Sequence, residues 1–159
     1  MRQTKNKFAQ AELKLIYKRA INPVTITNGN EAYSYFKSIW DKELINIQEQ
    51  FYVLFLNTAK EVICWRCLHT GTMSEALIDM KLIFALAYGC LASSFIVAHN
   101  HPSGYVNPTQ ADFILTKELT GVAKLLGFNL IDHLVIGNNQ YYSFLSKAQI
   151  GDFVLDVVS

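Results

Sequence analysis

Residues 94–112 read SFIVAHNHPSGYVNPTQAD, and this stretch decides the fold. Its opening letters, SFIVA, form a short apolar run that predicts a fully buried strand over 94–98. The letters PSG at 102–104 end that strand, because proline and glycine favour turns over a continuing ladder. We expect a helix over 109–126 that stops at Gly127, a residue suited to a helix C-terminus. The stretch therefore predicts a strand, a tight loop and a helix.

Strand and helix patterns alternate on both sides of this stretch. The apolar runs 51–56 and 62–68 flank a polar turn at 57–60, which predicts a hairpin of one buried and one half-buried strand. Interleaved strands and helices indicate the α/β or α+β class, with a mixed β-sheet sandwiched by helices. The other expected elements are an edge strand over 11–19, a helix over 31–40 capped by Asn28 or Asn30, a helix over 79–90, and a closing hairpin of 130–136 and 141–144.

The composition is that of a folded, nearly neutral protein. Hydrophobic residues make up 51% and charged residues 17% of 159 residues, which argues against disorder, and we expect a single domain over 1–159. No apolar run reaches the roughly 18 residues of a membrane-spanning helix, and no signal-peptide pattern is present, so we expect a cytoplasmic protein without a membrane partner. A net charge of +1 argues against a chain that binds nucleic acid over its whole surface.

Two smaller features receive structural interpretations. The basic residues of segment 1–19 favour a solvated arm, with a surface that contacts phosphate as the alternative. Cys64 and Cys67 form a C-x-x-C pair in a predicted strand, where residues three apart face opposite ways, so we expect structural thiols. We place His69 in a loop.

Two histidines and one aspartate in the opening stretch have the spacing of metal ligands. His99 and His101 are two residues apart at the end of a strand, so both side chains can reach one ion. Asp112 returns from the first turn of the next helix. Two imidazoles, one carboxylate and an open fourth position describe a catalytic zinc site. Taken alone, the histidines could be ordinary surface residues and Asp112 could close a capping box with Thr109, but together the three favour a metal site.

The string HNHPSG, followed by PTQAD, LTKEL, LLGFNLIDHLVIG and YYSF, resembles the RadC-like branch of the JAMM (MPN-plus) metalloprotease family. The resemblance covers residues 43–145, which would be the core metal-binding region, with 1–42 as an N-terminal strand and helix extension. It implies a layered fold like that of cytidine deaminases. It also implies one zinc ion per chain and hydrolysis of an amide, peptide or isopeptide bond. Longer members carry a helix-hairpin-helix region thought to contact DNA, and we expect this chain to be a short form without it.

The resemblance also implies two catalytic residues. Glu49 occupies the place of a glutamate that takes a proton from the zinc-bound water as general base. Thr109 stands where the family usually has a serine that helps to hold the developing oxyanion. His133 is expected near the metal cleft as a supporting or structural residue. The alternative to a peptide or isopeptide hydrolase is a DNA-repair-associated accessory domain with a structural or vestigial zinc site.

Overall fold

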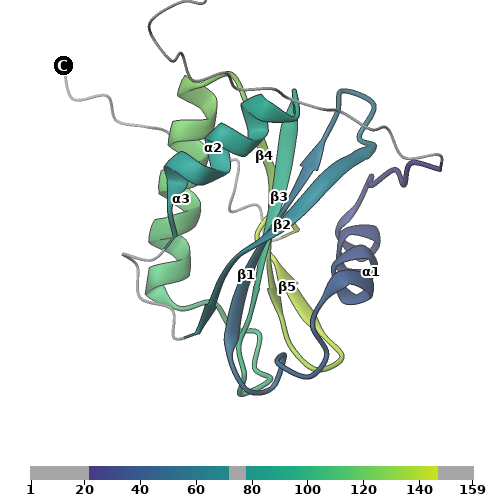
Figure 1. The fold of residues 1–159 in the computed structure, drawn as a ribbon. Helices are drawn as coiled ribbons and strands as arrows, with labels where there is room; N and C mark the ends of the chain where they lie inside the picture. The colour runs from purple at the N-terminus through teal and green to yellow at the C-terminus, as the bar shows by residue number, and fades with distance from the viewer. Residues whose placement is uncertain (1–21, 72–77, 147–159) are drawn as a thin grey trace, which may run out of the picture.

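The computed structural model describes residues 22–71 and 78–146, which form one mixed sheet with helices on both faces (Figure 1). The strand order is β2-β1-β3-β4-β5, and every neighbouring pair is antiparallel except β3 and β4, which are parallel. This confirms the expected α+β class. The strands are β1 (Glu49–Leu56), β2 (Val62–Gly71), β3 (Ser94–Asn100), β4 (Asn129–Ile136) and β5 (Tyr141–Ser143); the helices are α1 (Gly29–Ile39), α2 (Met80–Gly89) and α3 (Gln110–Leu125).

Alternating side chains of the central strands build two apolar cores, one on each face of the sheet. In β1, Phe51 and its odd-numbered neighbours pack against residues of α2 and α3, whereas Tyr52 and its even-numbered neighbours pack against α1. β1 and β3 are buried along nearly their whole length because both faces are covered. Figure 1 shows α2 and α3 together on one side and α1 alone on the other. The odd-numbered face of β1 and β3 is therefore the one that meets α3.

Each helix begins after a residue whose side chain caps its N-terminus. Asn28 caps α1 by accepting a hydrogen bond from the backbone N–H of Glu31, and Asp79 caps α2 in the same manner. Thr109 is the N-cap of α3, and Gly127, with φ of +80°, follows its end. None of the helices in the described residues is long and apolar enough to cross a membrane.

Three strands are longer than their apolar runs. β1 begins at Glu49, β3 continues to Asn100, and β2 continues to Gly71. The placement of His69 in a loop was therefore wrong, because ladder hydrogen bonds to β1 extend the strand through its polar end. The strand expected over 11–19 lies outside the described residues.

The two cysteines of the C-x-x-C motif lie on opposite faces of β2, as expected. Cys64 packs against the core beneath α2 and α3, and Cys67 packs against the core beneath α1. Both are free thiols. This arrangement agrees with a structural role for the pair.

Asp132, one residue before His133 in β4, joins β4 to the segment after β5. Its Oδ1 accepts hydrogen bonds from the backbone N–H groups of His133 (2.8 Å) and Leu145 (3.0 Å), and its Oδ2 accepts one from the Ser143 hydroxyl (2.6 Å). Burial raises the pKa of the Asp132 carboxyl despite these bonds. The folded protein therefore binds a proton at Asp132 more readily than the unfolded chain does.

We predict that Asp132→Ala lowers the free energy of unfolding by on the order of 3 kcal/mol, because it leaves buried donors without an acceptor. Asp132→Asn keeps an acceptor for the two backbone donors and is expected to lose less. Since the raised pKa favours the protonated folded state, the stability of the wild type relative to Asp132→Asn should fall as the pH rises from the ordinary aspartate value through the raised one. Urea denaturation of the three proteins across that pH range measures both effects. Equal stability of wild type and Asp132→Ala would contradict the role of the Asp132 carboxyl as the acceptor for these buried donors.

Candidate metal centre

His99 enters the site from the buried central strand β3. It is paired with Phe51 of β1 and is only 1% exposed, so its ring lies inside the protein beneath α3. The ring stacks on Phe51, with centroids 6.5 Å apart and planes 10° from parallel. This packing fixes the ring plane before any ligand is present.

His101 lies just after the end of β3, in the loop that leads to α3. Its backbone N–H donates to the carbonyl of Ile136 in β4 (3.3 Å), and its Nδ1 lies 2.9 Å from the carbonyl oxygen of Tyr105. The turn includes Gly104, whose φ of +80° favours glycine. Gly137 supports the turn from the β4–β5 connection, since a side chain there would collide with the Gly104 carbonyl. The loop is therefore held at both ends.

Asp112 lies in the first turn of α3 and divides its two oxygens between two tasks. Oδ2 accepts hydrogen bonds from the backbone N–H (2.7 Å) and the hydroxyl (2.8 Å) of Thr109, and the hydroxyl accepts in turn from the Asp112 N–H, which completes a capping box. Oδ1 lies 3.1 Å from Nε2 of His99. The capping and metal-binding interpretations of Asp112 are therefore compatible in one side chain.

The Thr109 hydroxyl has one proton, and that proton is directed at Asp112. The hydroxyl that was predicted to hold an oxyanion would have to release Asp112 before it could donate to a substrate. What the structure shows for Thr109 is support of the Asp112 carboxylate; its catalytic role stays a prediction.

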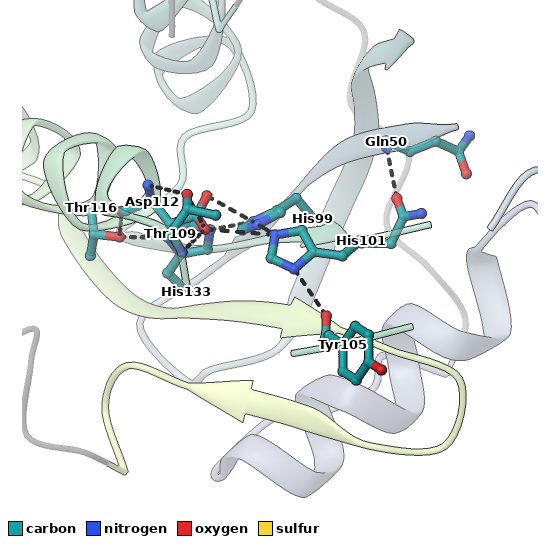
Figure 2. A network of polar contacts seen from close by, with 9 residues as sticks. Gln50, His99, His101, Tyr105, Thr109, Asp112, Thr116 and His133 are labelled. Atoms are coloured by element: carbon teal, nitrogen blue, oxygen red, sulfur yellow. Dashed lines mark hydrogen bonds and ion pairs between the residues drawn. The ribbon is translucent and has the colours of Figure 1, made fainter. Parts of the chain in front are cut away.

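The three ligand candidates converge on one point between β3 and α3 (Figure 2). Nε2 of His99 lies 3.1 Å from Nε2 of His101, and Nε2 of His101 lies 3.7 Å from Oδ2 of Asp112. A carbonyl oxygen only accepts hydrogen bonds, so the contact with Tyr105 places a proton on Nδ1 of His101 and leaves its Nε2 to face the others. Three potential ligand atoms, one from each residue, thus lie close enough together to hold one metal ion.

The pKa values of His101 and Asp112 are shifted by their closeness to each other. The hydrogen bond with Asp112 raises the pKa of His101, and the charge of Glu49 adds to this effect. Burial alone would raise the pKa of the Asp112 carboxyl, but the neighbouring side chains of His101 and His99 and the backbone N–H of Thr109 outweigh burial and hold that pKa well below its ordinary range. The carboxylate is thus ionised and turned towards two imidazoles.

The distances between these atoms fit a zinc ion. Zinc binds imidazole nitrogen at about 2.0–2.1 Å with tetrahedral geometry, which places neighbouring ligand atoms about 3.3 Å apart. The two Nε2 atoms lie 3.1 Å apart, and Nε2 of His99 lies 3.1 Å from Oδ1 of Asp112; both separations are close to that value. Nε2 of His101 lies 3.7 Å from the other oxygen, Oδ2, which also accepts from Thr109. Two nitrogens and one carboxylate oxygen also match the donor set of catalytic zinc sites, which keep the fourth position open.

Glu49 begins β1 on the face that carries His99. The β1–β3 register pairs Phe51 with His99, and Glu49 lies two residues before Phe51, on the same face of β1. The side chain of Glu49 is half-buried, and its charge acts on the pKa of His101. The structure thus brings Glu49 to the site without making it one of the three converging ligands.

Asn100, between the two histidines, is a residue whose role sequence reasoning missed. Its side chain points to the other face, where Oδ1 accepts from the backbone N–H of Gln50 (2.7 Å). Its Nδ2 donates to the carbonyls of Ile45 (2.7 Å) and Gln48 (2.9 Å). The amide is fully buried and holds the segment that leads into Glu49. The signal available in the sequence was a polar asparagine directly after an apolar strand, between two ligand candidates.

His133 and Thr116 lie behind the ligands. His133 was expected near the cleft, and its Nε2 lies 2.9 Å from Nδ1 of His99. Burial lowers its pKa well below the ordinary value, with the charge of His99 acting in the same direction. Thr116, one helical turn after Asp112, was not singled out from the sequence, although its i+4 spacing places it on the same face of α3.

The comparisons with known proteins agree with this geometry. The family model described as "RadC-like JAB domain" matches residues 26–150. A UPF0758 protein of Porphyromonas gingivalis is 46% identical over 101 residues, which cover 63% of this chain and 44% of that protein. A UPF0758 protein of Flavobacterium johnsoniae is 37% identical over 122 residues, which cover 77% of this chain and 52% of that protein.

The UPF0758 relatives carry names that state no activity. The chain spans about half the length of the curated relatives that it matches. The family match covers both helical layers and all five strands of the sheet, together with the three converging residues. The chain therefore belongs to the RadC-like JAB domain family.

Proposed function

We propose that this chain is a zinc-dependent hydrolase that cleaves an amide, peptide or isopeptide bond. The observation that carries the proposal is the convergence of Nε2 of His99, Nε2 of His101 and the Asp112 carboxylate within 4.8 Å of one another. Membership in the JAB family, which suggests hydrolase potential, supports the same conclusion.

Four residues of the chain would bind the zinc ion or transfer protons. His99, His101 and Asp112 would hold the zinc ion, which would lower the pKa of a water molecule and polarise the carbonyl of the substrate. Glu49 would act as general base: its carboxylate would accept a proton from that water and deliver it to the leaving amine. Its position at the start of β1, close enough for its charge to act on the pKa of His101, suits this role.

Support for a catalytic rather than a structural zinc comes from the number of ligands. Structural zinc sites are closed by four protein ligands, whereas the described residues bring three together here. A half-buried carboxylate beside the site adds the base that a structural site does not need. The alternative, a DNA-associated module with a structural zinc, has no specific observation among the described residues in its favour.

The proposed activity is tested by incubating the zinc-loaded protein with peptide, isopeptide-linked and small amide substrates. We expect release of amine from at least one class, loss of that activity on treatment with a chelator, and recovery on adding zinc back. Zinc bound at full stoichiometry with no hydrolysis of any class would instead favour the structural module.

Asp112→Asn separates the two tasks of Asp112. The amide can keep its oxygen towards Thr109 and so retain the capping box, but it would then turn Nδ2, which has no free lone pair, towards the histidines. We expect a stability near that of the wild type and a loss of zinc affinity of more than about 100-fold, because losing a metal ligand costs more affinity than losing a residue that only supports a ligand.

Asp112→Ala is the matched comparison, because it also removes the Asp112 half of the capping box with Thr109 and should cost a further ~1 kcal/mol of stability. Thermal melts and zinc titrations of both variants measure these effects. Normal zinc binding by Asp112→Asn would show that Asp112 only caps the helix.

A further inference from the structure

Three buried hydrogen bonds link His99 to Asp112 through two further side chains that are not themselves ligand candidates (Figure 2). Nδ1 of His99 lies 2.9 Å from Nε2 of His133, and Nδ1 of His133 lies 2.6 Å from the Thr116 hydroxyl. The Thr116 hydroxyl donates to the backbone carbonyl of Asp112 at 2.6 Å. This chain of hydrogen bonds thus runs from β3 through β4 into α3.

The direction of every proton in this chain follows from its last bond. The Asp112 carbonyl only accepts, so the single proton of the Thr116 hydroxyl lies between them, and the hydroxyl must accept from Nδ1 of His133. His133 is fully buried, and its ring nitrogens contact the imidazole of His99 and the hydroxyl of Thr116, neither of which would offset a buried positive charge. The ring therefore carries one proton, on Nδ1, and its Nε2 lone pair accepts from Nδ1 of His99. Nε2 of His99 is then left without a proton.

The reversed direction is disfavoured by the same distances. If His133 donated to His99, its Nδ1 would have to accept from the Thr116 hydroxyl. The hydroxyl oxygen and the Asp112 carbonyl oxygen would then face each other at 2.6 Å with no proton between them. Two lone-pair oxygens this close repel each other, so the forward direction is the one that the geometry supports.

Packing holds the middle ring of the chain in place. His133 is fully buried and stacks on Phe144, with centroids 4.9 Å apart and planes 10° from parallel. Phe51 contacts it edge-on from the other side, with centroids 6.1 Å apart. A ring clamped in this way keeps its two nitrogens directed at His99 and Thr116.

We propose that His133 and Thr116 are positioning residues that fix His99 in the tautomer with a proton on Nδ1 and a lone pair on Nε2. The proposal rests on the proposed function in one respect, that His99 is a zinc ligand. The Tyr105 carbonyl likewise holds a proton on Nδ1 of His101, so in their neutral forms both imidazoles present Nε2 lone pairs to the metal position. Support of this kind orients a metal-binding histidine and raises its basicity.

The first test measures zinc affinity in a competition titration with a zinc chelator. Thr116→Val has nearly the shape of threonine but removes the acceptor for His133, and we expect it to lower zinc affinity by about 10–100-fold. Thr116→Ser retains the hydroxyl and should restore wild-type affinity. The matched control is Thr120→Val. Thr120 lies one turn further along α3 and donates to the carbonyl of Thr116 at 2.7 Å in the same manner, but it takes no part in the hydrogen bonds that link His99 to Asp112.

The second test reads the tautomer directly in metal-free protein, by ¹⁵N NMR of the histidine rings at alkaline pH. In the wild type and in Thr120→Val we expect His99 to have a protonated Nδ1 and an unprotonated Nε2. In Thr116→Val we expect a mixture of the two His99 tautomers. This readout does not depend on zinc. A protein that binds no zinc or hydrolyses nothing would overturn the proposed function while the spectrum still decides the tautomer.

Two results would overturn the positioning role. One is a metal-free wild type in which Nε2 of His99 carries the proton. The other is a Thr116→Val variant with zinc affinity and ring ¹⁵N shifts equal to those of the wild type.

Discussion

His101→Ala is expected to abolish stoichiometric zinc binding in a protein that remains folded. Removing one of three protein ligands should cost far more than the 10 to 100-fold that loss of a supporting residue typically costs. His101 is the better choice for this test than His99, because its side chain is 13% exposed and leaves a smaller cavity than the fully buried ring of His99. Equilibrium dialysis followed by elemental analysis measures the bound zinc, and circular dichroism checks the fold.

His69→Ala is the matched control for His101→Ala. His69 pairs with Phe51 from β2, whereas His99 pairs with Phe51 from β3, so the control removes an imidazole from the same end of the sheet two strands away. It should bind zinc as the wild type does. If His69→Ala lost the metal and His101→Ala kept it, the ligand set would be wrong.

Glu49→Gln is expected to lower any hydrolysis by roughly 10²–10⁴-fold while zinc stays bound. The substitution keeps the size and hydrogen-bonding reach of the side chain and removes the proton acceptor, and general-base catalysis is worth that factor. Because Glu49 lies beside the ligands without being one of the three that converge, the zinc content should not change. The rate and the zinc content are measured on the same preparation.

Glu43→Gln serves as the control for the change in charge. Glu43 is exposed and precedes β1, so its substitution alters the net charge by the same amount away from the metal position. It should leave the rate unchanged. Equal rates and equal zinc in Glu49→Gln and the wild type would remove Glu49 from the mechanism and favour the DNA-associated module.

Much of the fold was predictable because local patterns encode it. The apolar run before His99 predicts a buried strand, and Asn28 and Thr109 mark helix starts through hydrogen bonds within four residues. The convergence of His99 with His101 follows from strand alternation. The longer reach of β1 and β3 was not predictable, since the first residues of β1 and the last residues of β3 are polar and join the sheet through pairing with other strands.

The contacts of the supporting residues were beyond local patterns for the same reason. His133 was expected near the cleft, but its contact with His99 joins residues 34 apart, and the contact of Asn100 with Gln50 joins residues 50 apart. Such contacts depend on which strands become neighbours, and no spacing rule contains that information. Resemblance to a family directed attention to Glu49, whereas a lone glutamate at the start of a strand would otherwise be assigned to solvent.

The most direct test of the zinc centre is elemental analysis of wild-type protein prepared without chelator, followed by zinc titration of the metal-free form. The proposed ligand set predicts about one zinc per chain as isolated and the same stoichiometry on titration. No metal in the isolated protein, together with no uptake on titration, would contradict the assignment of His99, His101 and Asp112 as a zinc site.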